Sequence, residues 1–185
     1  NRGRAVHYPC PPERGFIPSP EEIESLITKR TRAIVVINPN NPAGAVYPRH
    51  VLEAIARIAE KYHLVVLADE IYDQMTYDDA EFTPMATLVH QTLCGTLSGL
   101  SKVYRACGYR VGWAVFSGDL ENARDYLSAL ELLSSLRLCS NVAGQWAVQT
   151  ALGGYQSVKE LVRPGGRLYE SRKAIVNAVA RSKYL

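Results

Sequence analysis

Thr31-Arg-Ala-Ile-Val-Val-Ile37 and His63-Leu-Val-Val-Leu-Ala68 are two short runs of β-branched and other apolar residues. Continuous runs of this kind are typical of strands that are buried on both faces of a parallel sheet. Between them, residues 48–62 repeat apolar side chains at helical spacing, at Val51, Leu52, Ile55, Ile58 and Ala59. Strand, helix and strand with short connections predict two parallel strands joined by a right-handed crossover.

The rest of the chain extends this alternation and then becomes helical. Ser19-Pro-Glu-Glu22 combines a capping residue, a proline suited to the first helical position and acidic residues, which predicts a helix over about 20–29. Further strands are expected at about 92–97 and 111–116, with a short edge strand at 5–8. Helices are expected at about 85–89, 120–136, 142–152 and 167–183. This order predicts an α/β layered domain.

The composition is that of an ordinary globular chain and argues against several functions. Of the 185 residues, 47% are hydrophobic and 21% are charged, and the net charge of +3 is too small to favour nucleic acid or an anionic membrane as partner. No apolar run approaches the roughly 20 residues of a membrane span. The cysteines are far apart, without the spacing of metal ligands, which predicts reduced thiols in a cytosolic protein and no metal site: Cys10, Cys94, Cys107 and Cys139.

The two ends of the sequence are also informative. The chain begins without Met and ends inside the helical pattern of residues 167–183, with no stop signal. We therefore expect it to be a piece of a longer protein.

Three polar segments follow predicted strands: Asn38–Gly44, Asp69–Tyr72 and the loop that carries Lys102 and Arg110. Ligands of parallel sheets collect at the carboxyl ends of the strands. Taken singly, each segment has an ordinary interpretation. The first is a turn. In the second, Asp69 is a helix cap or a magnesium ligand and Tyr72 a core residue, and in the third, Lys102 and Arg110 are two surface cations. Taken together, they offer a carboxylate, hydrogen-bond donors, an arginine and a lysine, which is the set that a pyridoxal cofactor needs.

The motifs that carry this set also resemble those of a known family. Asn38-Pro-Asn-Asn-Pro-Ala-Gly44, Ala68-Asp-Glu-Ile-Tyr72 and Ser101-Lys-x-x-Arg-x-x-Gly-x-Arg-x-Gly-Trp113 are similar, in that order, to the motifs of class I/II aminotransferases. Those enzymes are pyridoxal-phosphate-dependent enzymes of fold type I. The spacings fit as well, with 28 residues from Asn41 to Asp69 and 33 from Asp69 to Lys102. The segment 131–141 further resembles the alanine aminotransferase branch.

The resemblance implies a role for each matching residue. Lys102 would form the Schiff base with pyridoxal 5'-phosphate and then move the proton between the substrate Cα and the cofactor. Asp69 would pair with the pyridine nitrogen, so that the ring can act as an electron sink. Tyr72 and Asn41 would hydrogen-bond the phenolic oxygen of the cofactor.

The phosphate-binding side of the resemblance is less regular. Arg110 would bind the phosphate bidentately, and Ser98 or Ser101 would add a hydroxyl. Gly99 stands three residues before the lysine, where many relatives have serine, and this departure weakens the assignment of Ser98. Ala43 stands where threonine is usual, which we expect to affect packing rather than chemistry.

The resemblance also implies an architecture, namely a three-layer α/β sandwich with a mainly parallel sheet. Residues 1–155 would form the central part of the cofactor-binding large domain, and residues 156–185 would lead toward a small C-terminal domain. The family's phosphate-cradling helix and its substrate-carboxylate arginine lie in segments that this sequence lacks. The sequence alone is therefore expected to be a poor transaminase, whereas the parent protein would be a cytoplasmic homodimer.

The expected activity is transfer of an amino group from an L-amino acid, with alanine as the first candidate, to a 2-oxo acid such as 2-oxoglutarate. A pyridoxal-dependent lyase of the same fold is an alternative, because motifs around the cofactor barely separate the two reactions. A second alternative is an aminotransferase-like sensor domain of a transcription regulator. A nucleotide-binding domain is excluded, because the sequence has no glycine-rich phosphate loop of the expected pattern.

Overall fold

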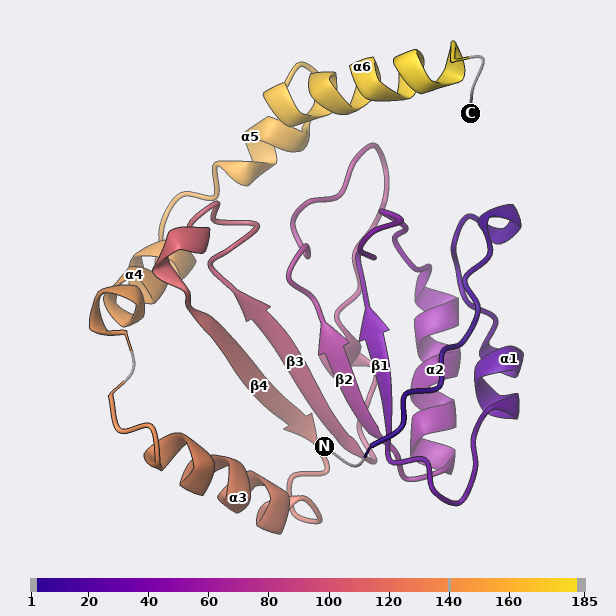
Figure 1. Cartoon of the computed structure of the whole chain (residues 1–185), viewed down its shortest axis with the longest axis vertical. Coiled ribbons are helices and arrows are strands. Elements are labelled where there is room, and N and C mark those ends of the chain that lie inside the picture. The colour runs from indigo at the N-terminus through magenta and orange to yellow at the C-terminus, as the bar shows by residue number, and fades with distance from the viewer. Residues whose placement is uncertain (1–2, 140, 183–185) are drawn as a thin grey trace.

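The computed structural model describes residues 3–139 and 141–182, and its centre is a four-stranded sheet (Figure 1). The strands are β1 (Ala33–Ile37), β2 (Val65–Asp69), β3 (Leu93–Gly99) and β4 (Gly112–Gly118). They lie side by side in chain order, β1 to β3 being parallel and β4 antiparallel to β3. The expected α/β fold with a mainly parallel sheet is confirmed.

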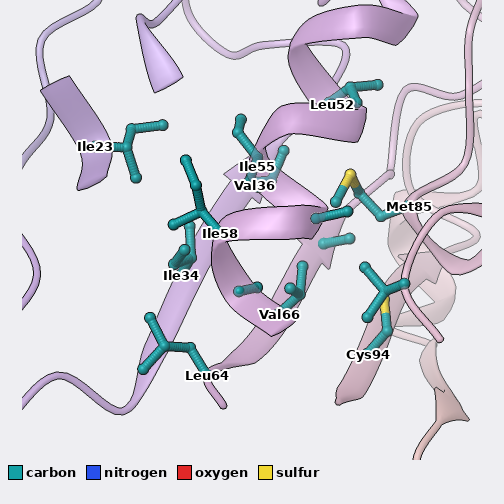
Figure 2. Packing of buried hydrophobic residues seen from close by; sticks show 14 of the residues in the cluster. Ile23, Ile34, Val36, Leu52, Ile55, Ile58, Leu64, Val66, Met85 and Cys94 are labelled. Atoms are coloured by element: carbon teal, nitrogen blue, oxygen red, sulfur yellow. The ribbon is translucent and has the colours of Figure 1, made fainter. Parts of the chain in front are cut away.

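Helices α1 (Pro20–Ser25) and α2 (Arg49–Lys61) lie together beside the β1 side of the sheet in Figure 1, and α2 provides much of the core. The helix begins after Pro48. Its apolar side is buried as the spacing predicted, at Val51, Leu52, Ile55, Ile58 and Ala59, and Ala56 is buried as well. Figure 2 shows Ile55 and Ile58 of α2 gathered with Val36 of β1 and Val66 of β2. The other side chains of β1 point the opposite way, and Val35 is 50% exposed.

The segment that leads into α1 has no strand, so the expected edge strand at 5–8 is wrong. Tyr8 reaches the sheet edge with its side chain instead, since its hydroxyl donates to the carbonyl of Val35 at 2.8 Å. The prolines that follow cannot donate a backbone hydrogen bond to a ladder. A single 3-10 turn, η1 (Pro12–Arg14), precedes α1, and Ser19 caps α1 by accepting from the Glu22 amide at 3.2 Å.

The connections near the sheet contain two more 3-10 turns, η2 (Met85–Thr87) before β3 and η3 (Cys107–Tyr109) before β4. After β4 the chain is helical, with α3 (Arg124–Ser135), α4 (Val142–Gly153), α5 (Val158–Val162) and α6 (Arg167–Ala180). Figure 1 shows these four helices in an arc that begins near the carboxyl end of β4 and runs to the side of the sheet where β1 to β3 end. No helix in the described parts of the chain is long and apolar enough to cross a membrane.

Candidate active site

The turn after β1 presents Asn41. Asn38, 2% exposed, accepts through its Oδ1 from the Tyr47 amide at 2.8 Å, so the turn is tied to the chain that leaves it. The Asn41 side chain is exposed, and its Nδ2 lies 3.5 Å from the hydroxyl of Tyr72, at the long end of hydrogen bonding. Asn41 and Tyr72, which come from two different strand ends, are therefore brought together.

Asp69 is the last residue of β2, and the register of the sheet fixes the face on which it lies. Its neighbours Ala68 and Glu70 are buried, whereas Asp69 pairs with Ile37 of β1 and Leu97 of β3 on the opposite face from α2. The amide of Ile71 donates to Asp69 Oδ1 at 3.2 Å. One carboxylate oxygen is thereby held by the backbone, and the other is left for a ligand.

Lys102 leaves a loop that is closed at its base. The Leu100 amide donates to the Val111 carbonyl at 3.0 Å, and the Ala106 amide donates to the Leu100 carbonyl at 2.9 Å. Leu100 and Val103, which flank the lysine, are 1% and 3% exposed. With these two anchors the exposed Lys102 Nζ lies 5.8 Å from the centroid of the Tyr72 ring, so the lysine joins the pair formed by Asn41 and Tyr72.

The residues expected to bind phosphate lie nearby but do not join this group. Arg110 is exposed, has a φ of 52°, and donates from its guanidinium to the Cys107 carbonyl at 2.9 Å. Ser101 is half-buried beside Lys102. Ser98 pairs with Trp113 in the sheet, and by its register it lies on the face opposite to Asp69.

Gly99 is required by the close approach of β3 and β4. A Cβ placed there would lie 2.7 Å from the Val111 carbonyl oxygen and 3.0 Å from the Gly112 Cα. Any side chain would therefore push the two strands apart at the base of the lysine loop. This contact gives the departure from serine at Gly99 a local physical reason.

Two buried polar residues beside the site went unnoticed in the sequence. Glu70 is 6% exposed and accepts from the Met85 amide at 2.8 Å, and burial raises its pKa to about 7. Tyr47 is 1% exposed and contacts the turn that carries Asn41. The burial of Glu70 could have been predicted from strand alternation. Successive residues face opposite sides of a sheet, so if Asp69 faces a ligand, Glu70 must face the core.

A cavity of about 420 Å³ lies on the other side of the lysine loop, toward α4 and α5. Arg105 of this loop donates to Ser157 Oγ at 2.5 Å across it. The remaining lining is mostly apolar or aromatic, for example Leu100, Val103 and Tyr155. The cavity is thus separate from the group formed by Asn41, Tyr72 and Lys102.

The site brings together an amide after β1, a phenol after β2 and a lysine after β3, and the Asp69 carboxylate lies at the end of β2. These are residue types that a pyridoxal cofactor needs. Residues 1–183 match the family described as aminotransferase class I and II. The chain belongs to this family, whose members depend on pyridoxal phosphate.

Named relatives support the same family. Glutamate-pyruvate aminotransferase AlaA of Escherichia coli (strain K12) is 52% identical over 170 residues, which are 92% of this chain and 42% of that protein. Alanine aminotransferase of Mycobacterium tuberculosis (strain H37Rv) is 49% identical over 92% of this chain and 40% of its own length. A crystal structure of an aminotransferase from Escherichia coli has a TM-score of 0.90 and 51% identity, and covers 92% of this chain and 42% of that one. The chain thus spans less than half the length of these relatives.

Proposed function

We propose that this chain carries the cofactor-binding and proton-transferring part of an aminotransferase. The reaction is transfer of the amino group of an L-amino acid, with alanine the first candidate, to a 2-oxo acid such as 2-oxoglutarate. The observation that carries the proposal is the meeting of Asn41, Tyr72 and Lys102 at the carboxyl ends of the sheet. The choice of alanine is supported by the names of the relatives that are about half identical.

The donor set fits pyridoxal phosphate group by group. The aldehyde of the cofactor matches the amine of the lysine, and its phenolic oxygen matches the two neutral donors. Its ring nitrogen matches the carboxylate, and its phosphate matches the guanidinium. When bound, it supplies an electron sink that stabilises negative charge at the substrate Cα. The side chains below would hold it and manage the protons around it.

Lys102 performs the covalent attachment and the proton transfer in this proposal. A lysine attacks a carbonyl through its neutral amine, and it needs a fixed exit from rigid structure. The buried side chains of Leu100 and Val103 on either side supply that fixed exit. With the cofactor bound, Lys102 Nζ would be the base that takes the proton from the substrate Cα and delivers it to the cofactor.

The other residues orient the cofactor. Asp69 would hold the proton on the ring nitrogen, and the Ile71 amide donates to one oxygen of this carboxylate. Asn41 and Tyr72 donate to the phenolic oxygen from two strand ends. Arg110, which donates to the Cys107 carbonyl, would bind the phosphate, since a guanidinium can bind two oxygens at once, and Ser101 or Ser98 would add a hydroxyl.

The organisation of the protein is also proposed. Residues 1–155 belong to the cofactor-binding domain and residues 156–185 lead toward a second domain. The active protein is a cytoplasmic homodimer. Free cysteines in the described residues support a reducing compartment. The exposed apolar side chains of α3 and α4, such as Leu132 (66%) and Trp146 (71%), support association with another surface.

The test is titration with pyridoxal phosphate, followed by borohydride reduction and peptide mapping. We expect a single reduced adduct on Lys102 and none there in Lys102→Ala. An adduct on another lysine would contradict the proposal. In the parent protein, alanine and 2-oxoglutarate should then yield pyruvate and glutamate together, and pyruvate formed without a 2-oxo acid would favour a lyase instead.

A further inference from the structure

Tyr47 is a buried tyrosine that links the turn after β1 to its surroundings. Its ring is 1% exposed and lies in the main hydrophobic core. Its amide donates to Asn38 Oδ1 at 2.8 Å, and its phenol oxygen accepts from Asn40 Nδ2 at 3.2 Å. The Cys10 Sγ lies 3.7 Å from the same phenol oxygen. One side chain therefore contacts the turn and the segment that precedes α1.

These contacts secure the residue directly before Asn41. The Asn40 amide donates to the Ala45 carbonyl, and its carbonyl accepts from the Gly44 amide, both at 2.8 Å. Its side-chain oxygen accepts from the Ala43 amide at 3.3 Å, which leaves the side-chain nitrogen for the phenol of Tyr47. The backbone N–H and C=O of Asn40, and both the oxygen and the nitrogen of its side-chain amide, are thus hydrogen-bonded.

Asn41 itself has less to hold it. Its side chain is exposed and reaches Tyr72 at 3.5 Å. Its position therefore depends on the backbone on either side, and Tyr47 is the core residue to which that backbone is tied. Because the phenol accepts from Asn40, its own proton is free to be donated to Cys10.

We propose that Tyr47 is a positioning residue, which acts through Asn40 to hold Asn41 where the phenolic oxygen of pyridoxal phosphate is bound. The inference rests on the proposed function of this site. Burial raises the pKa of Tyr47 above its ordinary value, so the ring stays a neutral phenol that can both accept and donate. The residue touches neither substrate nor cofactor.

The test uses Tyr47→Phe, which keeps the ring and removes the hydroxyl. Tyr62→Phe is the matched control, because the Tyr62 hydroxyl also makes a side-chain hydrogen bond, to Glu24 at 2.9 Å, on a helix end away from the site. Loss of one hydrogen bond predicts about a threefold to tenfold weaker Kd for pyridoxal phosphate in Tyr47→Phe and a change below about twofold in Tyr62→Phe. Hydrogen exchange without cofactor should be faster at the Gly44 amide in Tyr47→Phe alone.

A double-mutant cycle separates positioning from a general loss of stability. If Tyr47 acts through Asn41, the loss of affinity caused by Tyr47→Phe should disappear in an Asn41→Ala background. Two results would overturn the inference and leave the proposed function standing. One is an equal loss of affinity from Tyr47→Phe with and without Asn41→Ala. The other is an unchanged Kd in Tyr47→Phe while Asn41→Ala binds pyridoxal phosphate more weakly. An unchanged Kd in Asn41→Ala, with no adduct on Lys102, would refute the proposed function and the inference with it.

Asn40→Ala provides a second route to the same result if Tyr47→Phe folds poorly. This variant removes the amide that donates to the phenol and leaves the Tyr47 ring in the core. It should weaken the Kd in the same direction and lose its effect in the Asn41→Ala background. An additive effect in that background would count against positioning.

Discussion

Helices α2 and α3 have similar lengths and both carry apolar side chains, yet they differ completely in burial. Six residues of α2 are buried, whereas α3 has none among those described. Across α3 to α6, the described residues that are buried are Gly144 and Val158. The difference shows that apolar side chains become a core only where the sheet offers a matching face, and here β1 to β3 offer it to α2.

The largest expected effect tests this comparison at one leucine in each helix. Leu52 of α2 is 0% exposed, and Leu132 of α3 is 66% exposed. Leu52→Ala should lower the free energy of unfolding by about 3 to 5 kcal/mol, because it leaves a cavity, whereas Leu132→Ala should change it by less than about 0.5 kcal/mol. Urea unfolding of both variants, at a protein concentration low enough to keep the chain monomeric, provides the measurement. Equal losses would show that α3 packs against the rest of the chain.

The second effect depends on pH and concerns the buried Glu70. Its pKa of about 7 lies above the ordinary value of 4.5, so between these values the folded chain keeps a proton that the unfolded chain has released. Stability should therefore fall as the pH rises from about 4.5 to 7, by at most about 3 kcal/mol. Glu70→Gln, followed by unfolding at several pH values, should flatten this slope. A slope that survives in Glu70→Gln must come from other groups.

The third effect compares two tyrosine hydroxyls. The Tyr8 hydroxyl donates to the carbonyl of Val35 at the edge of β1, and burial raises the pKa of Tyr8 to about 12. The hydroxyl of the exposed Tyr155 donates to Glu160. Tyr8→Phe should lower the free energy of unfolding by about 1 kcal/mol in thermal unfolding. Tyr155→Phe should lower it less, because water can replace the partner of an exposed hydroxyl. The reverse order would mean that the segment before α1 is not fixed by Tyr8.

The smallest effect concerns the link between α6 and the loop after Tyr72. A guanidinium nitrogen of Arg172 lies 3.2 Å from a carboxylate oxygen of Asp78, and both side chains of this ion pair are exposed. The guanidinium carbon also lies over the Tyr77 ring, 5.0 Å from its centroid. Arg172→Ala should therefore change stability by at most about 0.5 kcal/mol and should vary with salt. Faster hydrogen exchange near residues 77–79 would reveal the loss of the link. Unchanged exchange there would show that α6 does not restrain the loop.

Much of the fold could be predicted because its elements have clear local signals. The cap at Ser19 and the buried side of α2 were both confirmed. Helix α1 ends at Ser25 rather than near residue 29, because Thr28 and Thr31 hydrogen-bond the local backbone: the Thr31 hydroxyl accepts from the Thr28 amide, and the Thr28 hydroxyl accepts from the Arg30 amide. The order of β1 to β3 depends on pairing between residues far apart in the chain, which no local pattern contains.

The candidate site was predictable in its residue types and only partly in its geometry. The motifs pointed to Asn41, Tyr72 and Lys102, which the fold brings together. The placement of Ser98 and Arg110 depends on sheet register and on a loop with positive φ, so the sequence could not supply it. Tyr47 escaped notice because a lone tyrosine before a helix resembles any other core residue.

The closed base of the lysine loop also has a consequence for folding kinetics. β3 and β4 form an antiparallel hairpin whose connection spans residues 100–111, whereas β1 and β2 are joined across residues 38–64. Closing a shorter loop costs less entropy, so we expect the hairpin to form before the parallel strands join it. For each kcal/mol of stability lost, Leu93→Ala in β3 should then slow folding more than Ile34→Val in β1. The opposite ranking would refute this order of folding. In that sequence of events the lysine reaches its final loop early, and Asn41, Asp69 and Tyr72 assemble around it as the rest of the sheet forms.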